Sequence, residues 1–234
     1  MVKGLRLAAI AGLGLLGACT RPVDDPLAVR SIYWGLAPLP QYDGPLPQVL
    51  WSAPETPARQ SLLYTAMVDA EVAAQYAGRA RASGDPALVR NALGEMLYAL
   101  DPALAPDWEA KATGIVRGWA GTGYGLRRAA AGMADELRAA AAAGDAPPAL
   151  ADYALPAAEC ADNALAWAER LVLLSQDAAA TAAPEADPLL QQIQELATQL
   201  NHGALDRVDG AAPDPACGLA HAVRFLEPLT PRRS

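Results

Sequence analysis

The chain has 234 residues, and its 18 basic and 26 acidic side chains give it a formal net charge of −8 at pH 7. This acidic balance excludes the basic footprint with which proteins bind nucleic acid, and it gives no general attraction to anionic lipid. A composition rich in alanine and leucine, with few β-branched residues and a single phenylalanine, predicts an all-α protein.

The first 18 residues have the pattern of a secretory signal peptide. Lys3 and Arg6 precede an uncharged apolar run over residues 7–16, and small residues follow it. The run has about half of the ~20 residues needed to span a bilayer, so we expect cleavage rather than a retained membrane helix. Cleavage after Ala18 leaves 216 residues with 16 basic and 26 acidic side chains, a net charge near −10.

Leu16-Gly17-Ala18-Cys19, at the end of this run, resembles the lipobox of bacterial lipoproteins. The resemblance implies that Cys19 becomes the first residue of the mature protein and carries acyl chains such as palmitate. Two or more chains hold a protein stably at a membrane. In that family an aspartate after the cysteine favours the inner membrane, and this chain has Thr20 there. The resemblance therefore implies attachment to the outer membrane, facing the periplasm. An ordinary secretory signal with a chance cysteine is the alternative.

Residues 19–54 differ from the rest of the chain because they hold seven prolines, which block helix interiors. We expect an extended tether between the membrane and a helical domain over residues 55–234. Two interpretations of its large apolar side chains remain open: the tether packs along the helical domain, or it offers aromatic anchors to a partner. These side chains are Ile32, Tyr33, Trp34, Tyr42, Val49, Leu50 and Trp51.

Apolar residues recurring at three- and four-residue steps predict the helices of the domain. Start signals include Ser52-Ala53-Pro54-Glu55, which has the spacing of a capping box, a second start at Thr56-Pro57 one turn later, and repeated Asp-Pro pairs. Four glycines between Gly118 and Gly125 predict a break or kink near residues 120–124. We expect an antiparallel bundle of about six or seven helices joined by short loops. Their expected spans are about 55–82, 86–100, 107–119, 125–143, 157–180, 187–202 and 214–227.

Cys160 and Cys217 are the two thiols besides Cys19, and each is expected in the first turn of a helix. An even pair in an oxidising compartment is usually a disulfide. Closing a loop of about 57 residues stabilises a protein by ~4 kcal/mol on chain-entropy grounds. A disulfide here would clamp the fifth and last helices together, and two unrelated buried thiols are the alternative.

The glycine cluster from Gly118 to Gly125 is the segment most similar to a ligand-binding loop. A phosphate loop needs a preceding strand, whereas a helical pattern precedes this cluster, which also lacks Gly-Lys-Ser and Gly-Lys-Thr. We therefore expect the glycines to allow a bend or a close approach of helices. A ligand-binding elbow lined by Trp119, Tyr124 and Trp167 is the alternative.

Residue spacing gives no metal or catalytic motif. His202 and His221 lie on different elements, and Asp69 and Glu71 are two residues apart, so they face different directions on a helix. No Gly-x-Ser-x-Gly elbow marks a nucleophile. We expect no metal, no cofactor and no catalytic residue. The methionines at helical spacing are expected to fill the core; they are Met67, Met96 and Met133.

These features together predict a membrane-anchored periplasmic lipoprotein that acts as a non-catalytic interaction or assembly accessory in the cell envelope. Its expected partners are the membrane, through the N-terminal lipid, and another envelope protein, with no nucleic acid. The alternative is a periplasmic helical bundle that binds a small molecule, a peptide or a metal. An enzyme whose site assembles only in three dimensions is a third option.

Overall fold

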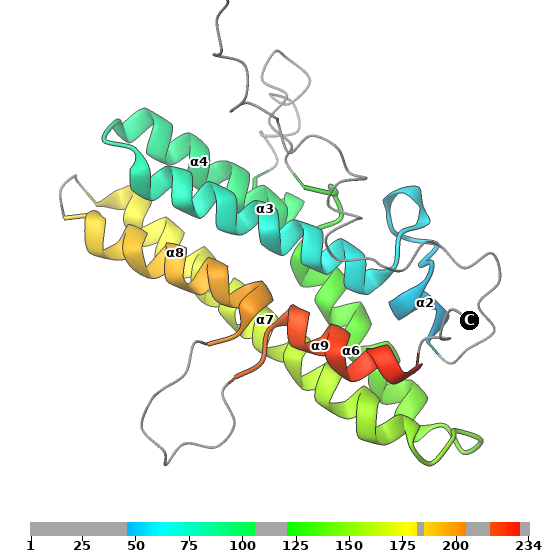
Figure 1. Cartoon of the computed structure of the whole chain (residues 1–234). Coiled ribbons are helices and arrows are strands. Elements are labelled where there is room, and N and C mark those ends of the chain that lie inside the picture. Colours follow the sequence, from blue (N-terminus) through cyan, green and yellow to red (C-terminus); the bar gives the residue numbers. More distant parts are fainter. Residues whose placement is uncertain (1–45, 106–120, 182–184, 205–215, 230–234) are drawn as a thin grey trace, which may run out of the picture. The chain divides into compact units, whose positions relative to one another are not determined.

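A computed structural model describes residues 46–105, 121–181, 185–204 and 216–229, and these residues form an all-α bundle, which confirms the predicted fold class (Figure 1). Three short 3-10 turns, η1, η2 and η3, span Pro57–Arg59, Pro102–Leu104 and Glu227–Leu229. The helices are α2 (Pro47–Leu50), α3 (Leu62–Ala82), α4 (Pro86–Leu100), α6 (Leu126–Ala142), α7 (Leu150–Ala180), α8 (Asp187–His202) and α9 (Leu219–Leu226).

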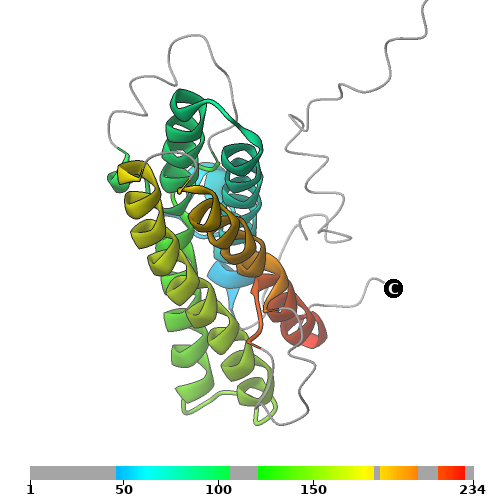
Figure 2. The same ribbon diagram turned by 90° about the vertical axis from the view of Figure 1, so that its left-hand side faces the viewer.

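Two helices organise the bundle. The helix α3 contacts α2, α4, α6, α8 and α9, and it is buried along most of its length. The 31-residue α7 runs beside α6 and α9 with its first half and beside α8 with its second half (Figures 1 and 2). Along one side of α3, the helices α4 and α6 lie one after the other. Along another side, α8 and α9 do the same.

The predicted ends of the helices are confirmed where local capping decides them. Asp85 caps α4 by accepting a hydrogen bond from the Ala87 N–H at 2.7 Å. The helix α6 begins directly after the glycine loop, as expected, and α8 ends at Gly203, whose φ of 77° breaks the helix. The expected spans of α4, α6 and α8 therefore agree with the structure to within about one residue.

The first long helix begins later than predicted, at Leu62. Ala58 and Arg59 adopt φ values of 54° and 52°, in the left-handed region that interrupts a helix. Ser61 then caps α3 by accepting a hydrogen bond from the Tyr64 N–H at 3.1 Å. The capping-box spacing at Ser52 is therefore not used, and the expected start near residue 55 is wrong.

The fifth helix begins earlier than predicted, at Leu150 rather than near residue 157. Pro156 lies inside α7, where it removes one backbone hydrogen bond without ending the helix. Burial of Leu150, Ala154 and Ala157 on the same helix compensates for that loss. Cys160 is therefore well inside α7, and the expectation of a first-turn cysteine is wrong.

The last helix begins at Leu219, so Cys217 precedes it instead of lying in its first turn. Gly218 takes the N-cap position with an extended backbone. Two expected features lie outside the described residues: the helix near 107–119 and the Asp-Pro pair at 214–215.

The end of the predicted tether belongs to the bundle. Leu46, Val49, Leu50 and Ala53 are buried, and α2 contacts α3 and α6. This short part follows the interpretation in which the segment packs on the domain. Residues 1–45, with the signal-like run, Cys19 and the aromatic side chains near residues 32–42, lie outside the described residues.

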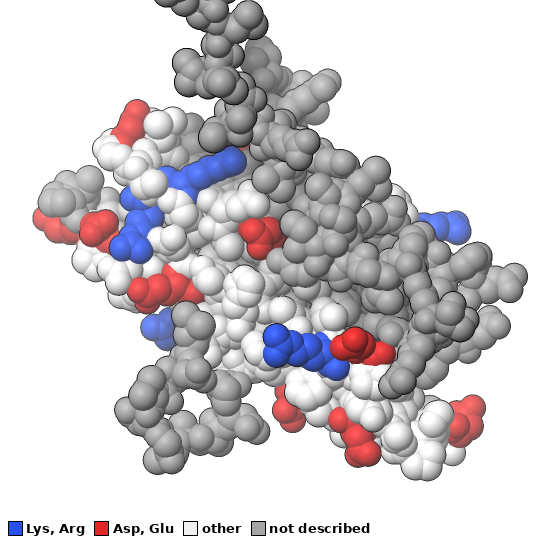
Figure 3. All heavy atoms as spheres, viewed as in Figure 1, with Lys and Arg blue, Asp and Glu red and all other residues white. Residues whose placement is uncertain are grey.

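The core is built largely from alanine, leucine and methionine. Met67, Met96 and Met133 are buried, which confirms them as core residues. Basic and acidic side chains are interspersed over the face shown in Figure 3. Among the described helices, none has the length and apolar character required to cross a membrane.

Candidate functional site

A buried carboxylate on α3 lies beside the loop that precedes α6, near the end of α4. Asp69 is on α3 and has an exposed fraction of 0%. Its Oδ1 accepts a hydrogen bond from the Thr122 N–H at 2.6 Å, and its Oδ2 accepts from the Thr122 hydroxyl at 2.8 Å and from the Gly125 N–H at 3.1 Å. We call Asp69 and residues 121–125 together the Asp69 cradle.

The hydroxyl of Thr122 is held in one orientation. Its Oγ1 accepts a hydrogen bond from the Tyr124 N–H at 3.2 Å, so its proton is directed to Asp69. One short loop thus supplies three donors to a single carboxylate. Charged acceptors of this kind form the stronger protein hydrogen bonds.

The glycines of the loop are required by both conformation and space. Gly121 has φ +85°, and a Cβ there would lie 2.5 Å from Asp69 Oδ1. Gly125 has φ +94°, and a Cβ there would lie 2.7 Å from Pro102 Cδ. These close approaches confirm the predicted break in the helical pattern and give its physical reason.

Burial raises the pKa of Asp69 to about 7, while the hydrogen bonds from Thr122 and Gly125 lower it in part. The carboxylate is therefore a group of the core that changes charge near neutral pH. Among the described residues, the donors to Asp69 are Thr122 and Gly125 of the 121–125 loop, so the arrangement holds that loop onto α3.

Ion pairs reinforce the same junction on the outside. Arg127, at the start of α6, lies 3.1 Å from the carboxylate of Asp101 and 4.0 Å from that of Glu169 on α7. Asp101 also accepts a hydrogen bond from the Ala103 N–H at 3.0 Å. The end of α4, the start of α6 and the middle of α7 are therefore linked through one arginine.

The predicted ligand-binding residues are only partly placed by the structure. Tyr124 is half-buried, and the guanidinium of Arg128 lies 4.5 Å from the centre of its ring. Trp167 is half-buried on α7, and Trp119 lies outside the described residues. The ligand-binding elbow stays a prediction.

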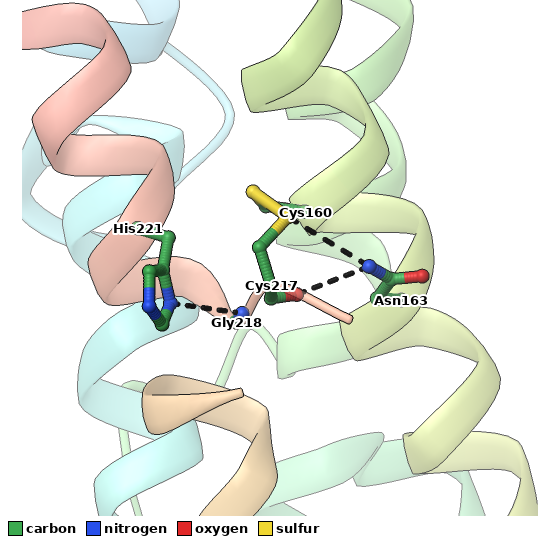
Figure 4. The surroundings of a disulfide bond; sticks show 5 residues. All are labelled: Cys160, Asn163, Cys217, Gly218 and His221. Carbon is green, nitrogen blue, oxygen red and sulfur yellow. Dashed lines mark hydrogen bonds between the residues drawn. A yellow bond between two sulfur atoms is a disulfide. The ribbon is translucent and has the colours of Figure 1, made fainter. Parts of the chain in front are cut away.

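Cys160 and Cys217 form a disulfide, as the sequence predicted, with their Cα atoms 4.9 Å apart. Figure 4 shows the Asn163 side chain beside it: Nδ2 donates to the Cys217 carbonyl oxygen at 3.1 Å and lies 3.7 Å from the Cys217 Sγ. On the other side, His221 Nδ1 accepts a hydrogen bond from the Gly218 N–H at 3.3 Å. The disulfide joins α7 to the residues that lead into α9.

The residues that follow α8 contact the residues that precede α9. The Ala204 N–H donates to the Ala216 carbonyl oxygen at 3.0 Å. Gly218 approaches so closely that a Cβ there would lie 2.5 Å from the Gly203 nitrogen. We call Gly203, Ala204, Ala216 and Gly218 the neck. Nearby, the buried Asn201 donates from Nδ2 to the Met67 carbonyl oxygen of α3 at 3.2 Å.

Sequence reasoning missed Asp69 as a site residue. Its spacing from Glu71 places the two acids on different sides of a helix and marks no site, although Asp69 lies one turn before Ala73 on an apolar stripe. An acid on such a stripe, together with a glycine cluster elsewhere in the chain, was the available signal. Which loop would reach the acid depends on tertiary packing that spacing does not encode.

The described residues contain no group of three or more histidine, cysteine or acidic side chains placed to hold a metal ion. Comparisons with models of known protein families, with curated proteins and with solved structures found no match to this chain.

Proposed function

We propose that this chain is a lipid-anchored, non-catalytic accessory of the cell envelope, attached to the outer membrane and facing the periplasm. The observation that carries the proposal is a pair of features from different parts of the chain. A single cysteine, Cys19, ends a signal-like run, and the two other cysteines are joined as a disulfide inside the bundle. Both features suit an exported protein in an oxidising compartment.

The contacts around the glycine loop favour an accessory over a ligand-binding bundle. The donors of Thr122 and Gly125 are taken up by Asp69, and Arg128 lies over the ring of Tyr124. These groups hold helices together, so their present contacts serve the fold. A periplasmic bundle that binds a small molecule, a peptide or a metal is the second outcome that the experiments below separate.

The segment from residue 20 to residue 45 is the proposed contact with an envelope protein. Residues 46–54 are part of the bundle, because Leu46, Val49 and Leu50 are buried there. A deletion that reached residue 54 would damage the domain itself. The aromatic side chains left for a partner are Tyr33, Trp34 and Tyr42.

The first experiment tests the anchor. Cells that express the full chain are fed a palmitate analogue that carries an alkyne, and the protein is isolated and examined for the label. We expect label on the wild type and none on Cys19→Ser. The Cys160→Ser/Cys217→Ser double variant is the matched control and should keep its label. An unlabelled wild type, or a labelled Cys19→Ser, contradicts the proposal.

The second experiment tests the partner by crosslinking in intact cells. The wild type is compared with a variant in which Tyr33, Trp34 and Tyr42 are alanine and with one in which residues 20–45 are replaced by a Gly/Ser linker of equal length. We expect a specific crosslink to an envelope protein that both variants lose while they stay membrane-bound. A crosslink kept by both variants would place the partner on the bundle. Co-purification of a small molecule or metal with no crosslink would favour the binding alternative.

A further inference from the structure

The helix α9 is short and buries few side chains. It has eight residues, and its buried side chains are Leu219, Ala222 and Leu226. Isolated helices of this length are not stable in water, because nucleation costs more than so few hydrogen bonds return. Its docking therefore depends on the surface beneath it and on the attachments at its ends.

The helix α9 packs against α7, α8 and α3. The first half of α7 is buried mainly through alanines, and each alanine offers little apolar area to a neighbour. These alanines are Ala154, Ala157, Ala158, Ala161 and Ala164.

Several attachments of α9 lie at its N-terminal end. Cys217 lies two residues before the helix and is covalently bound to Cys160 of α7. The Asn163 side chain donates to the Cys217 carbonyl oxygen, and the neck contributes the Ala204–Ala216 hydrogen bond. The disulfide is the strongest of these ties because it alone is covalent.

We propose that the Cys160–Cys217 disulfide is a clasp that a dithiol can open, and that opening it releases α9 and exposes the apolar surface that its buried side chains now cover. The closed form is the state that the structure shows. The open form would present apolar surface of the bundle to its surroundings while the α3, α4, α6 and α7 core stays folded. The clasp does not depend on the lipid anchor or on the proposed function.

The chemistry of opening follows from the exposure of the two cysteines. Cys160 has an exposed fraction of 0%, whereas Cys217 is half-buried. A thiolate of the dithiol attacks the Cys217 sulfur, forming a mixed disulfide and releasing Cys160 as a thiolate that takes up a proton. The second thiol of the reductant then attacks the reductant's sulfur atom in the mixed disulfide and releases Cys217. The protein gains two electrons and two protons, and the dithiol becomes a disulfide.

Asn163 has a positioning role in this exchange. Its Nδ2 lies 3.7 Å from the Cys217 Sγ, where an N–H favours negative charge on sulfur. While Cys217 still lies beside α7, the same amide would stabilise its thiolate. It would thereby make Cys217 the better leaving group when the mixed disulfide is resolved.

The test is amide hydrogen exchange of the full chain, followed by mass spectrometry, with and without dithiothreitol. In the oxidised protein we expect α9 to be protected. In the reduced protein we expect α9 amides to exchange within about tenfold of the unstructured rate, while central α3 amides stay far slower. The Cys160→Ala/Cys217→Ala variant should behave like the reduced wild type with or without dithiothreitol.

Two results would overturn the clasp. In the first, α9 stays as protected in the reduced protein as α3, so that packing alone holds it. In the second, all helices lose protection together, so that the disulfide supports the whole bundle. Brief treatment with glutathione tests the chemical step, since the mixed disulfide should form on Cys217. Its formation on Cys160 would contradict the order of attack.

Discussion

A single carboxylate and a few glycines connect two helices that are far apart in the sequence. Asp69 draws three donors from the loop at residues 121–125, and Gly121 leaves room for its Oδ1. Among the described residues no opposite charge balances this buried acid, and hydrogen bonding and desolvation oppose each other there. Small changes at these residues should therefore have measurable effects on stability.

Substituting Gly121→Ala should lower the free energy of unfolding by about 2 kcal/mol or more, because it adds left-handed strain and forces Asp69 away. The midpoint of urea denaturation measures this loss. Gly144→Ala is the matched control, since nothing lies within 4 Å of a Cβ at that position. It should change stability by no more than about 0.5 kcal/mol. Equal effects at the two glycines would contradict the described cradle.

The ionisation of Asp69 should make stability depend on pH in a defined direction. Its folded pKa of about 7 lies above the ordinary value of 3.8, so the folded protein binds the proton more tightly. Its contribution to the free energy of unfolding is complete below about pH 4 and is lost as the pH rises through 7. The loss amounts to at most about 4 kcal/mol.

The difference in unfolding free energy between the wild type and Asp69→Asn, measured from pH 4 to pH 8, isolates this effect. The other titrating groups are common to both proteins and cancel. We expect the difference to fall with rising pH and to level off above 7. Thr122→Val, which removes a donor to the carboxylate, should move the fall to higher pH. A flat difference would show that Asp69 does not titrate in this window.

The sequence predicted that two cysteines form a disulfide, but it did not predict which residues of other types contact one another across the fold. Cys160 and Cys217 could be paired because they are two thiols in one domain that the sequence predicts to be exported. Asp69 could not be matched with Thr122, since 53 residues separate them and a backbone N–H carries no sequence signature.

At the scale of elements, the sequence predicted α4, α6 and α8 well because their ends depend on local chemistry. Asp85 and Gly203 act within one turn of the helix end that they mark. The starts of α3 and α7 could not be predicted, for opposite reasons. The helix α3 starts later than predicted because Ala58 adopts a left-handed conformation. The helix α7 starts earlier because tertiary burial keeps it helical on both sides of Pro156.

Pro156 gives a prediction for α7. Substituting Pro156→Ala restores an N–H to the helix interior and removes the ring from the preceding turn, so it should raise the free energy of unfolding by about 1–3 kcal/mol. Chemical denaturation measures the gain. Pro188→Ala is the control, because Pro188 lies in the first turn of α8, where an N–H has no partner in the helix. A loss at Pro156 would mean that the proline fits its site without cost.

At the scale of the whole molecule, the described bundle has two central helices and a disulfide that links α7 to the residues before α9. The disulfide closes a loop of 57 residues that contains about two thirds of α7 and all of α8. Such a link restricts the unfolded chain as well as the folded one. Its effect should therefore reach beyond α9.

The Cys160→Ala/Cys217→Ala variant should unfold with a free energy lower by up to about 4 kcal/mol. Guanidinium denaturation of the oxidised wild type and the variant gives the difference. Asp162→Asn is the control, since it removes only the exposed ion pair with Arg138 in the same part of α7. That change should cost about 0–1 kcal/mol. Equal stability of the wild type and the double variant would show that the disulfide adds nothing to the fold.

The neck between α8 and α9 has a practical consequence for studying this protein. Ala204 and Ala216 are held together by their own hydrogen bond, so the bundle fixes where the intervening stretch leaves and returns. A longer connection between Ala204 and Ala216 lowers the stability of the fold only slightly, since loop-closure entropy grows only slowly with length. An affinity tag or a fluorescent domain inserted within residues 205–215 would therefore leave both Cys19 and α9 untouched. The protein could then be followed in living cells with its proposed anchor and its clasp intact.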